Sequence, residues 1–269
     1  MVPPIGFLIV VPTLDSYRLL PRLLTSLKNQ SFPFWRLLFI DGPSRPEHRL
    51  WLDACCAREP RCQWVPQVPE ESGIFGAMNQ GFAAAADSTC FAEWMLFWGS
   101  DDWAASSNVL AEIWNLLECE MSRPDLLVCG GRYFELSTGR FGRSTIFQPP
   151  SLLTATAYRR ALLLGSTPPH QATLFGPGAR QRLASYASGF RLSADLDYFL
   201  QLSRYSGLRV QCLDLELVHM ADGGVSGQQT QRRLQEVRRA YLRAFGWLWW
   251  FPFLMRYLRR VVSLLDRSR

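Results

Sequence analysis

The chain has 269 residues, of which 48% are hydrophobic, and this is enough for one large domain or one domain with an appendage. Its formal net charge of +6 is uneven, because residues 228–269 contain ten arginines and two acids, which leaves residues 1–227 slightly acidic. The seven cysteines include no C-x-x-C pair, which argues against a disulfide framework or a zinc site. With no signal-peptide pattern and no uncharged run of transmembrane length, we expect a cytoplasmic protein with reduced cysteines.

In the first half of the chain, short apolar runs alternate with segments of helical spacing. The predicted strands are Gly6–Val11, Trp35–Ile40, Gln63–Val65, Trp94–Trp98 and Leu126–Cys129. The predicted helices are one capped by Asp15 or Ser16 that extends through Asn29, followed by Glu47–Arg58, Gly73–Ala86 and Ser107–Met121. This alternation predicts an α/β fold with a mostly parallel, doubly wound sheet.

The pattern changes after Gly131, where we expect a small antiparallel portion. Arg132–Glu135 and Arg143–Phe147 flank a turn and predict a hairpin. The later predicted elements are helices at Pro177–Tyr186, Ala194–Ser206 and Thr230–Phe245, a strand at Arg209–Leu213 and a glycine-rich loop at Val218–Ser226.

Two adjacent carboxylates, Asp101 and Asp102, follow the predicted strand Trp94–Trp98. Neighbouring side chains on extended backbone point to opposite sides, so one can accept a sugar hydroxyl while the other binds a divalent cation. Alone, such a pair is more often a helix cap and a solvated residue. However, Pro12–Asp15 and Asp41–Ser44 also follow strands, and the carboxyl ends of parallel strands share one edge. The sequence therefore predicts a carboxylate-lined crevice that needs a cation or a hydroxyl-rich ligand.

Seven short blocks of the chain resemble, in the same order, those of family 2 glycosyltransferases. They are Pro12–Asp15, Asp41–Ser44, Gly73–Gly81, Gly99–Asp102, Pro169–Thr173, Ala194–Tyr198 and Gly223–Ser226. The resemblance extends from Gly6 to Phe245. It implies a nucleotide-sugar-binding α/β fold of GT-A type, and transfer of a sugar from a nucleotide diphosphate donor with inversion, using Mg²⁺ or Mn²⁺. No dinucleotide fingerprint, P-loop or nucleophile elbow competes with this interpretation.

The resemblance also implies roles for single residues. The expected donor-binding residues are Thr13, Asp15, Asp41, Asn79, Asp101 and His170. Among them, Asp41 would contact the base and Asp101 the ribose, whereas Asp102 would hold the metal on the diphosphate. Asp195 would be the general base for the acceptor hydroxyl; the alternative is an acid favoured by the dipole at a helix N-terminus. A structural role is favoured for His219.

The chain departs from the family pattern at two of these blocks. Asp15 stands where an asparagine is common, and Gly76 stands where an aspartate is common. Gly76 removes a carboxylate on the acceptor side, so this departure concerns the acceptor more than the donor.

We expect residues 1–227 to form the catalytic domain, with a nucleotide-sugar-binding half (1–131) and an acceptor half (132–227). Residues 228–269 form a basic, aromatic helical tail. Its tryptophans and arginines beside an apolar face are typical of a helix at a membrane interface, and packing against the core is the alternative. No module that reads nucleic acid bases is recognisable, so no nucleic-acid partner is expected.

The predicted function is sugar transfer to a lipid-linked or polysaccharide acceptor, in cell-envelope biosynthesis, by an enzyme peripherally bound to the inner face of the cytoplasmic membrane. Two alternatives are a non-catalytic nucleotide-sugar-binding protein and a nucleotidyltransferase. The latter lacks its G-x-G-x-R-type loop after the first strand.

Overall fold

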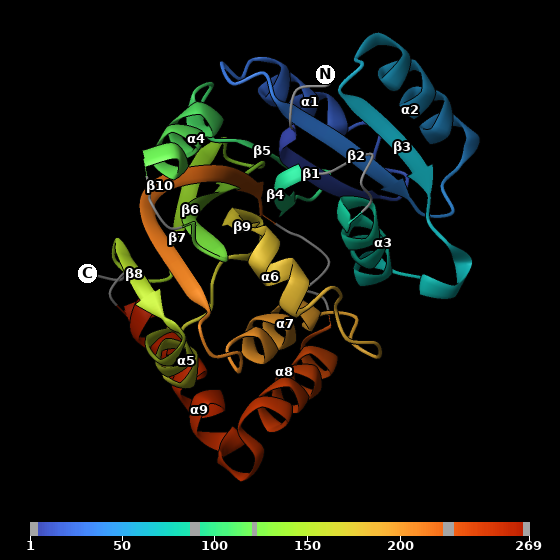
Figure 1. Ribbon diagram of the computed structural model, residues 1–269. Coiled ribbons are helices and arrows are strands. Elements are labelled where there is room, and N and C mark those ends of the chain that lie inside the picture. Colours follow the sequence, from blue (N-terminus) through green and yellow to red (C-terminus); the bar gives the residue numbers. More distant parts are fainter. Residues whose placement is uncertain (1–4, 87–91, 120–122, 223–228, 266–269) are drawn as a thin grey trace.

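The computed structural model describes residues 5–86, 92–119, 123–222 and 229–265. Within these ranges, ten strands form a central sheet with helices on both faces (Figure 1). The strands are β1 (Ile5–Thr13), β2 (Trp35–Asp41), β3 (Cys62–Pro66), β4 (Ala92–Phe97), β5 (Asp102–Ala104), β6 (Leu126–Glu135), β7 (Arg140–Thr145), β8 (Ser151–Thr154), β9 (Thr173–Phe175) and β10 (Arg209–Ala221). The α-helices are α1 (Leu20–Lys28), α2 (Pro46–Arg58), α3 (Ile74–Ala86), α4 (Val109–Cys119), α5 (Ala155–Leu163), α6 (Pro177–Arg182), α7 (Ala194–Leu202), α8 (Thr230–Phe245) and α9 (Trp250–Leu265).

The first half of the sheet is parallel. β3, β2, β1 and β4 are neighbours in that order, and α1, α2 and α3 connect them. Their apolar residues are buried on both faces, because helices cover both sides of the sheet. The register places Thr13 opposite Asp41 and Val10 opposite Phe97, so the carboxyl ends of β1, β2 and β4 meet at one edge. The predicted α/β fold with a mostly parallel sheet is confirmed.

The second half of the sheet is mixed. β9 lies antiparallel between β4 and β6, and β10 runs parallel to β6. The predicted hairpin is present as β6 and β7, but its second strand begins at Arg140 and its first continues unbroken from Leu126. β9 escaped prediction because a strand of three residues is too short to show a periodicity.

Several predicted boundaries differ from the structure, among them the end of α7, which lies at Leu202 and not at Ser206. Three other differences are the following. α1 begins at Leu20, after the predicted cap, because Asp15 adopts a left-handed conformation with φ of 49° and turns the chain before the helix. α6 ends at Arg182 because Leu183 is already extended. β10 continues to Ala221 and so includes the start of the predicted glycine-rich loop.

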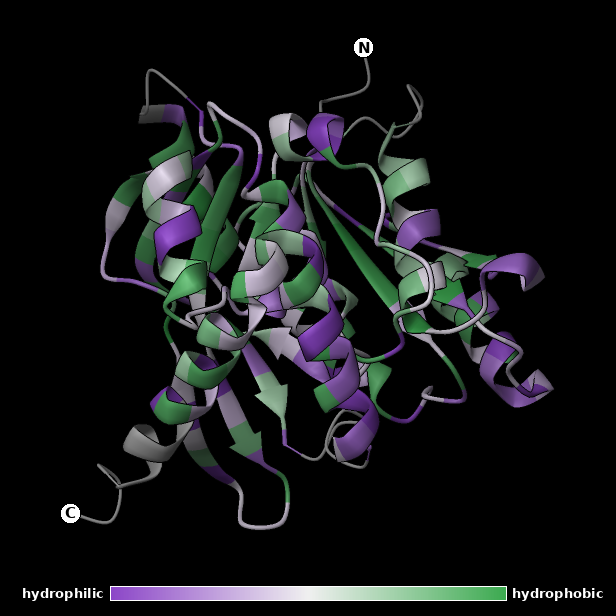
Figure 2. Ribbon diagram, turned by 90° about the horizontal axis from the view of Figure 1, so that it is seen from below, coloured by the Kyte–Doolittle hydropathy of each residue, from purple (hydrophilic) through white to green (hydrophobic). Residues whose placement is uncertain are grey.

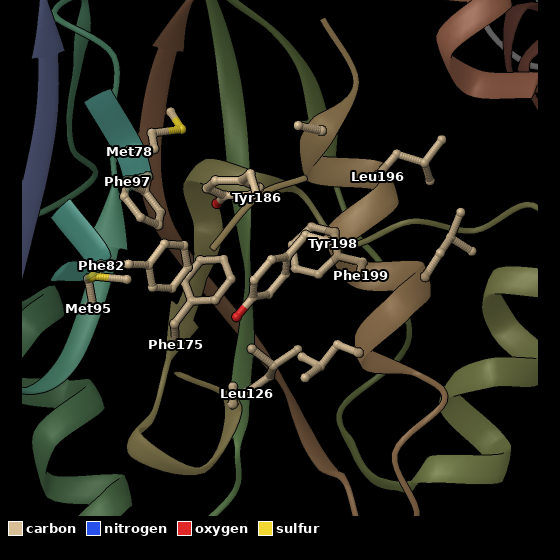
Figure 3. Close-up of a cluster of buried hydrophobic side chains, with 14 of the residues drawn as sticks. Met78, Phe82, Met95, Phe97, Leu126, Phe175, Tyr186, Leu196, Tyr198 and Phe199 are labelled. Carbon is tan, nitrogen blue, oxygen red and sulfur yellow. The ribbon is translucent and has the colours of Figure 1, made fainter. Parts of the chain in front are cut away.

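Two hydrophobic cores lie on the two faces of the sheet. Alternate residues of β1 supply each core, because successive side chains of a strand point to opposite faces. Ile9 packs towards α1, α2 and α4, whereas Val10 packs towards α3 and α5–α8. The second core contains a dense aromatic cluster (Figure 3). In Figure 2 the central strands carry most of the hydrophobic colour, and hydrophilic residues gather on helices and outer loops.

The last two helices pack onto the second face. α8 contributes Val237, Ala240 and Tyr241 to the core. α9 crosses the turn at Gly165 so closely that an added Cβ would lie 2.4 Å from Arg256 N. None of the helices in the described ranges is long and apolar enough to cross a membrane.

Candidate active site

Asp41 organises the edge at which β1 and β2 end. Its side chain is fully buried, and Oδ1 accepts hydrogen bonds from Thr13 Oγ1 (3.0 Å) and Ser44 Oγ (2.6 Å). His48 Nε2 lies 3.1 Å from the same oxygen, and Arg49 Nε donates to Oδ2 at 3.3 Å. Both oxygens are engaged, so Asp41 ties the two strand ends to α2. The predicted donor residues Thr13 and Asp41 are therefore in direct contact.

The loop after β1 is tied to the loop after β2 through Asp15. Asp15 N donates to Ser44 Oγ at 2.9 Å, and Arg45 N donates to Asp15 Oδ1 at 2.8 Å. Aspartate tolerates a left-handed backbone better than most residues, because its short side chain bonds locally. Asp15 thus lies exposed at the rim of the edge that Asp41 organises.

Asp101 and Asp102 lie beside this rim, at the carboxyl end of β4. Ser100 joins the two loops, since its Oγ donates to Pro12 O (3.3 Å) and accepts from Ser16 Oγ (2.8 Å). Asp102 is only 3% exposed, and its Oδ2 accepts a hydrogen bond from Gly99 N at 2.6 Å. Burial raises the pKa of the Asp101 carboxyl and raises that of Asp102 well above its usual range.

These carboxylates fit a divalent cation that also binds a diphosphate. Within the described residues, neither Asp101 nor Asp102 has an ion-pair partner, so their charge is uncompensated. The same residues contain no group of three or more His, Cys, Asp or Glu able to hold a metal alone. Mg²⁺ commonly takes one or two carboxylates and completes its shell with phosphate and water. Gly99 keeps this space open, because an added Cβ would lie 2.8 Å from Asp101 Oδ1.

His170 lies in the aromatic cluster on the other side of β4. Its ring stacks on Phe97 with centroids 5.5 Å apart, and its Nε2 lies 2.6 Å from the Tyr186 hydroxyl. Burial lowers the pKa of His170 and so favours the neutral ring. Trp98 Nε1 donates to Gln171 O at 3.0 Å, which holds this segment beside the end of β4. His170 is therefore next to the carboxylate edge but buried.

Asn79 of α3 bonds to the backbone of Tyr186 rather than pointing to open space. Its Oδ1 accepts from Tyr186 N at 2.7 Å, and its Nδ2 donates to Tyr186 O at 3.2 Å. Both ends of the amide are occupied, so Asn79 holds the segment before α7. Its predicted direct contact with the donor stays a prediction.

Steric crowding explains why a glycine occupies position 76. An added Cβ would lie 1.9 Å from Glu71 O, because the short 3₁₀ turn Pro69–Glu71 packs directly on α3. The aspartate common in the family does not fit this backbone arrangement.

α7 carries Asp195 and Asp197 in its first turn, in different surroundings. Asp195 is half-buried on the side of the aromatic cluster. Burial lowers the pKa of His170 and raises that of Tyr186, and in both cases the nearby charge of Asp195 is a smaller contribution that raises the pKa. Asp197 is buried on the other side and forms an ion pair with Arg243 of α8. Asp197 is thus engaged by α8, whereas Asp195 has no ion-pair partner among the described residues.

The family profile described as glycosyl transferase family 2 matches residues 8–176, which is more than half of the chain. The chain belongs to glycosyl transferase family 2. The matched segment contains the strand ends of β1, β2 and β4 and reaches the His170 segment. The predicted family is thus confirmed, and the chain is a glycosyltransferase.

Known proteins resemble this family 2 glycosyltransferase over most of its length. The "PGL/p-HBAD biosynthesis glycosyltransferase" of Mycobacterium bovis is 26% identical over 194 residues, which cover 71% of this chain and 67% of that protein. The structure of S. aureus TarS 1–349 aligns with a TM-score of 0.65 at 16% sequence identity. The alignment covers 89% of this chain and 66% of the TarS chain. The mannosyltransferase PcManGT of Pyrobaculum calidifontis, in complex with GDP-Man and Mn²⁺, gives 0.61 at 14% identity, with coverages of 90% and 65%. These structures confirm the GT-A type fold.

The sequence analysis did not single out Glu236 of this glycosyltransferase. This buried carboxylate of α8 accepts hydrogen bonds from three consecutive backbone N–H groups, those of residues 191–193, at 3.0, 2.8 and 3.0 Å. The three groups directly precede α7, so Glu236 fixes the segment that leads to Asp195. A signal was present, since Glu236 is one of two acids in the basic residues 228–269.

Two further predictions concern β10 and the segment after it. His219 Nε2 lies 2.6 Å from Glu216 Oε1, and its ring packs edge-on against Trp103, which supports the structural role that was favoured for it. The block Gly223–Ser226 lies outside the described residues.

Proposed function

We propose that this enzyme transfers a sugar, with inversion, from a nucleoside diphosphate sugar to an acceptor hydroxyl, in the presence of Mg²⁺ or Mn²⁺. The observation that carries this proposal is the pair Asp101, half-buried, and Asp102, buried, where β1, β2 and β4 end. Neither carboxylate has an ion-pair partner among the residues that the structure describes. Structural neighbours support it, because one holds GDP-Man with Mn²⁺ and another holds UDP-GlcNAc.

In this proposal the carboxylate edge binds the donor. Thr13, Asp15 and Asp41 shape the nucleoside pocket and Asp101 accepts the ribose hydroxyls, while Asn79 and His170 hold the wall behind the sugar. Asp102 holds the divalent ion on the diphosphate. When bound, this ion neutralises the charge that develops on the leaving diphosphate.

The transfer is a single displacement. The acceptor oxygen forms a bond to the anomeric carbon on the face opposite the diphosphate, the bond to the diphosphate oxygen breaks, and its electron pair leaves with the diphosphate. The proton of the acceptor hydroxyl passes to the carboxylate of Asp195. Asp195 suits this role because no ion pair engages it within the described residues, whereas Asp197 is paired with Arg243.

Titration calorimetry with UDP and GDP, with and without Mn²⁺, tests the donor site. Asp102→Asn should lose the Mn²⁺-dependent part of binding, and undiminished binding would contradict the metal role. Asp195→Asn should keep donor affinity but lose about 10²–10⁴-fold in turnover, followed as nucleoside diphosphate release with a membrane extract as acceptor. Donor binding with no turnover by the wild type would indicate a non-catalytic binding protein.

The C-terminal helices support a further part of the proposal, contact with a membrane surface that carries the acceptor. The short turn before α9 and the first nine residues of α9 leave apolar side chains exposed: Trp247 (78%), Trp250 (49%), Leu254 (49%) and Leu258 (48%). Aromatic and aliphatic side chains beside arginines insert shallowly into anionic membranes. We propose a lipid-linked or polysaccharide acceptor at the inner face of the cytoplasmic membrane.

Co-sedimentation with vesicles of phosphatidylglycerol and phosphatidylcholine tests this surface. The double variant Trp247→Ser, Trp250→Ser should bind fewer vesicles than the wild type, and high salt should release only part of the bound wild-type protein. Leu50→Ser is the control, because Leu50 is also a large hydrophobic side chain, 67% exposed, but lies on α2. A wild-type protein that stays in the supernatant would contradict the proposal.

A further inference from the structure

An open cavity of about 570 Å³ lies beside the segment that leads into α7. Its lining residues are Gly189, Gln231, Arg232, Gln235, Glu236 and Arg239. Five of them come from the first ten residues of α8, and the sixth comes from the loop before α7. The cavity shares none of these residues with the carboxylate edge that we assign to the donor, so it is a separate feature of the enzyme.

The two arginines of the cavity are held in place with donor groups to spare. Arg239 lies over the ring of Phe190, with Cζ 4.7 Å from the ring centroid, and its Nη1 donates to Gly189 O at 3.2 Å. Gly189 makes room for it, because an added Cβ there would lie 3.0 Å from Arg239 Nη1. Arg232 is anchored through Nε to Glu236 Oε1 at 3.3 Å. A guanidinium has five N–H groups, so these contacts leave several N–H groups available.

The one acidic side chain among the described lining residues, Glu236, is already hydrogen-bonded within the protein. The carboxylate of Glu236 accepts the three N–H groups of residues 191–193 and the N–H of Arg232. What remains for a ligand is two guanidinium groups and the amides of two glutamines. Such a donor-rich, positively charged wall suits an anion that can accept several hydrogen bonds, and phosphate oxygens meet this requirement through bidentate contacts with arginine.

We infer that this cavity binds a phosphate or diphosphate group carried by the acceptor. The inference rests on the proposed function, because it assumes an acceptor whose hydroxyl reaches Asp195. Glu236 bonds to Ser193 N at 3.0 Å, and Asp195 is two residues further, so the cavity wall lies within about 12 Å of the Asp195 Cα. One acceptor can thus place its anionic group in the cavity and its hydroxyl at Asp195. The diphosphate of the donor is assigned to the Asp102 edge, so the cavity is left for the acceptor.

Titration calorimetry with inorganic pyrophosphate, in EDTA, tests the cavity on the full chain. Without a divalent ion, the carboxylates of the donor edge repel pyrophosphate, so the remaining binding reports the cavity. Arg239→Gln and Arg232→Gln should each weaken binding about tenfold, the loss expected for a charge-assisted hydrogen bond. Arg238→Gln is the matched control: Arg238 precedes Arg239 on α8 but lies over Trp249 and does not line the cavity. It should bind as the wild type does.

Two further probes separate the sources of the phosphate. A sugar phosphate that binds more tightly than pyrophosphate, through Arg239, would indicate a phosphorylated glycan acceptor, and short-chain phosphatidic acid that does so would indicate a lipid phosphate. Absence of pyrophosphate binding, or equal binding by the wild type and both cavity variants, would overturn the inference. Nucleoside diphosphate binding with Mn²⁺, measured on the same proteins, keeps the two proposals apart. Intact donor binding without pyrophosphate binding refutes only the cavity, whereas failure of donor binding in the wild type refutes the proposed function.

Discussion

Glu236→Gln is the sharpest test of how this fold positions α7, the helix that carries the proposed base Asp195. The substitution keeps the size of the side chain but replaces one acceptor oxygen by an NH₂ group. That group cannot accept from the backbone N–H groups of residues 191–193, and it faces at least one of them. The segment before α7 should therefore loosen, and Asp195 should lose its fixed place.

The size of the effect follows from the bonds that are lost. A hydrogen bond to a charged group contributes about 1.5–3 kcal/mol, and an unpaired buried donor costs about 1–3 kcal/mol more. Relaxation of the partly exposed loop recovers part of this, so we expect a loss of about 2–4 kcal/mol in the free energy of unfolding. For a chain of this size, about 1 kcal/mol lowers Tm by about 2–4 °C, which gives a drop of about 4–16 °C.

Thermal denaturation measures the loss of stability, and steady-state kinetics measures the effect of displacing Asp195. A base displaced by about 1 Å can cost about 10²-fold in rate, so kcat should fall while affinity for the nucleoside diphosphate stays unchanged. Arg232→Gln is the matched control for Tm, because it removes only a half-exposed ion pair to Glu236 and should cost less than about 1 kcal/mol. If Glu236→Gln has the same Tm and the same kcat as the wild type, the carboxylate does not position α7.

Two other predictions concern Gly76 of α3 and the buried His170. Gly76→Ala should lower Tm by several degrees in thermal denaturation, although alanine normally stabilises a helix, because its Cβ would meet Glu71 O and overpacking costs about 1–3 kcal/mol; Gly142→Ala, whose Cβ would meet Tyr133 O only at 3.7 Å, should have no such effect. Because burial lowers the pKa of His170 from 6.5, the stability that its neutral ring contributes is present above that pH and is lost as the pH falls. The decrease in Tm from about pH 7 to about pH 5 should accordingly be smaller in His170→Gln than in the wild type, and an equal decrease would contradict the assignment.

The position of the carboxylate edge could be predicted from sequence because it depends on local features. The apolar run before Gly99 marks a buried strand, and parallel strands bring Asp41, Asp101 and Asp102 to one edge whatever the details of packing. The contacts at that edge could not be predicted. Asp41 is saturated by Thr13 and by residues of α2, and that depends on how α2 is oriented.

Long-range contacts explain the other differences. Asn79 and Tyr186 are 107 residues apart, and no pattern in either segment announces that the amide of one binds the backbone of the other. Glu236 likewise acts on a segment more than forty residues earlier in the chain. A composition-based division at residue 228 separates α8 from the body, yet α8 holds the segment that leads to the proposed base. The charge of the tail is thus visible in sequence, whereas its role in positioning α7 depends on tertiary packing.

Asp195 and Asp197 show how helical periodicity and burial together separate two neighbouring carboxylates. Two positions apart on a helix, they point about 200° away from each other, so only one can face the site. Burial raises the pKa of Asp197 although Arg243 acts in the opposite direction, so the ion pair offsets only part of the cost of burying this charge, and the stability that the group contributes decreases as the pH rises. Asn has nearly the same shape and carries no charge that must be buried, and Arg243, 39% exposed, can turn to solvent, so the substitution should cost little at position 197. We expect Asp197→Asn to keep both Tm and sugar transfer, and Asp195→Asn to keep Tm and lose transfer; a folded Asp197→Asn protein without transfer activity would mean that the base is assigned to the wrong carboxylate.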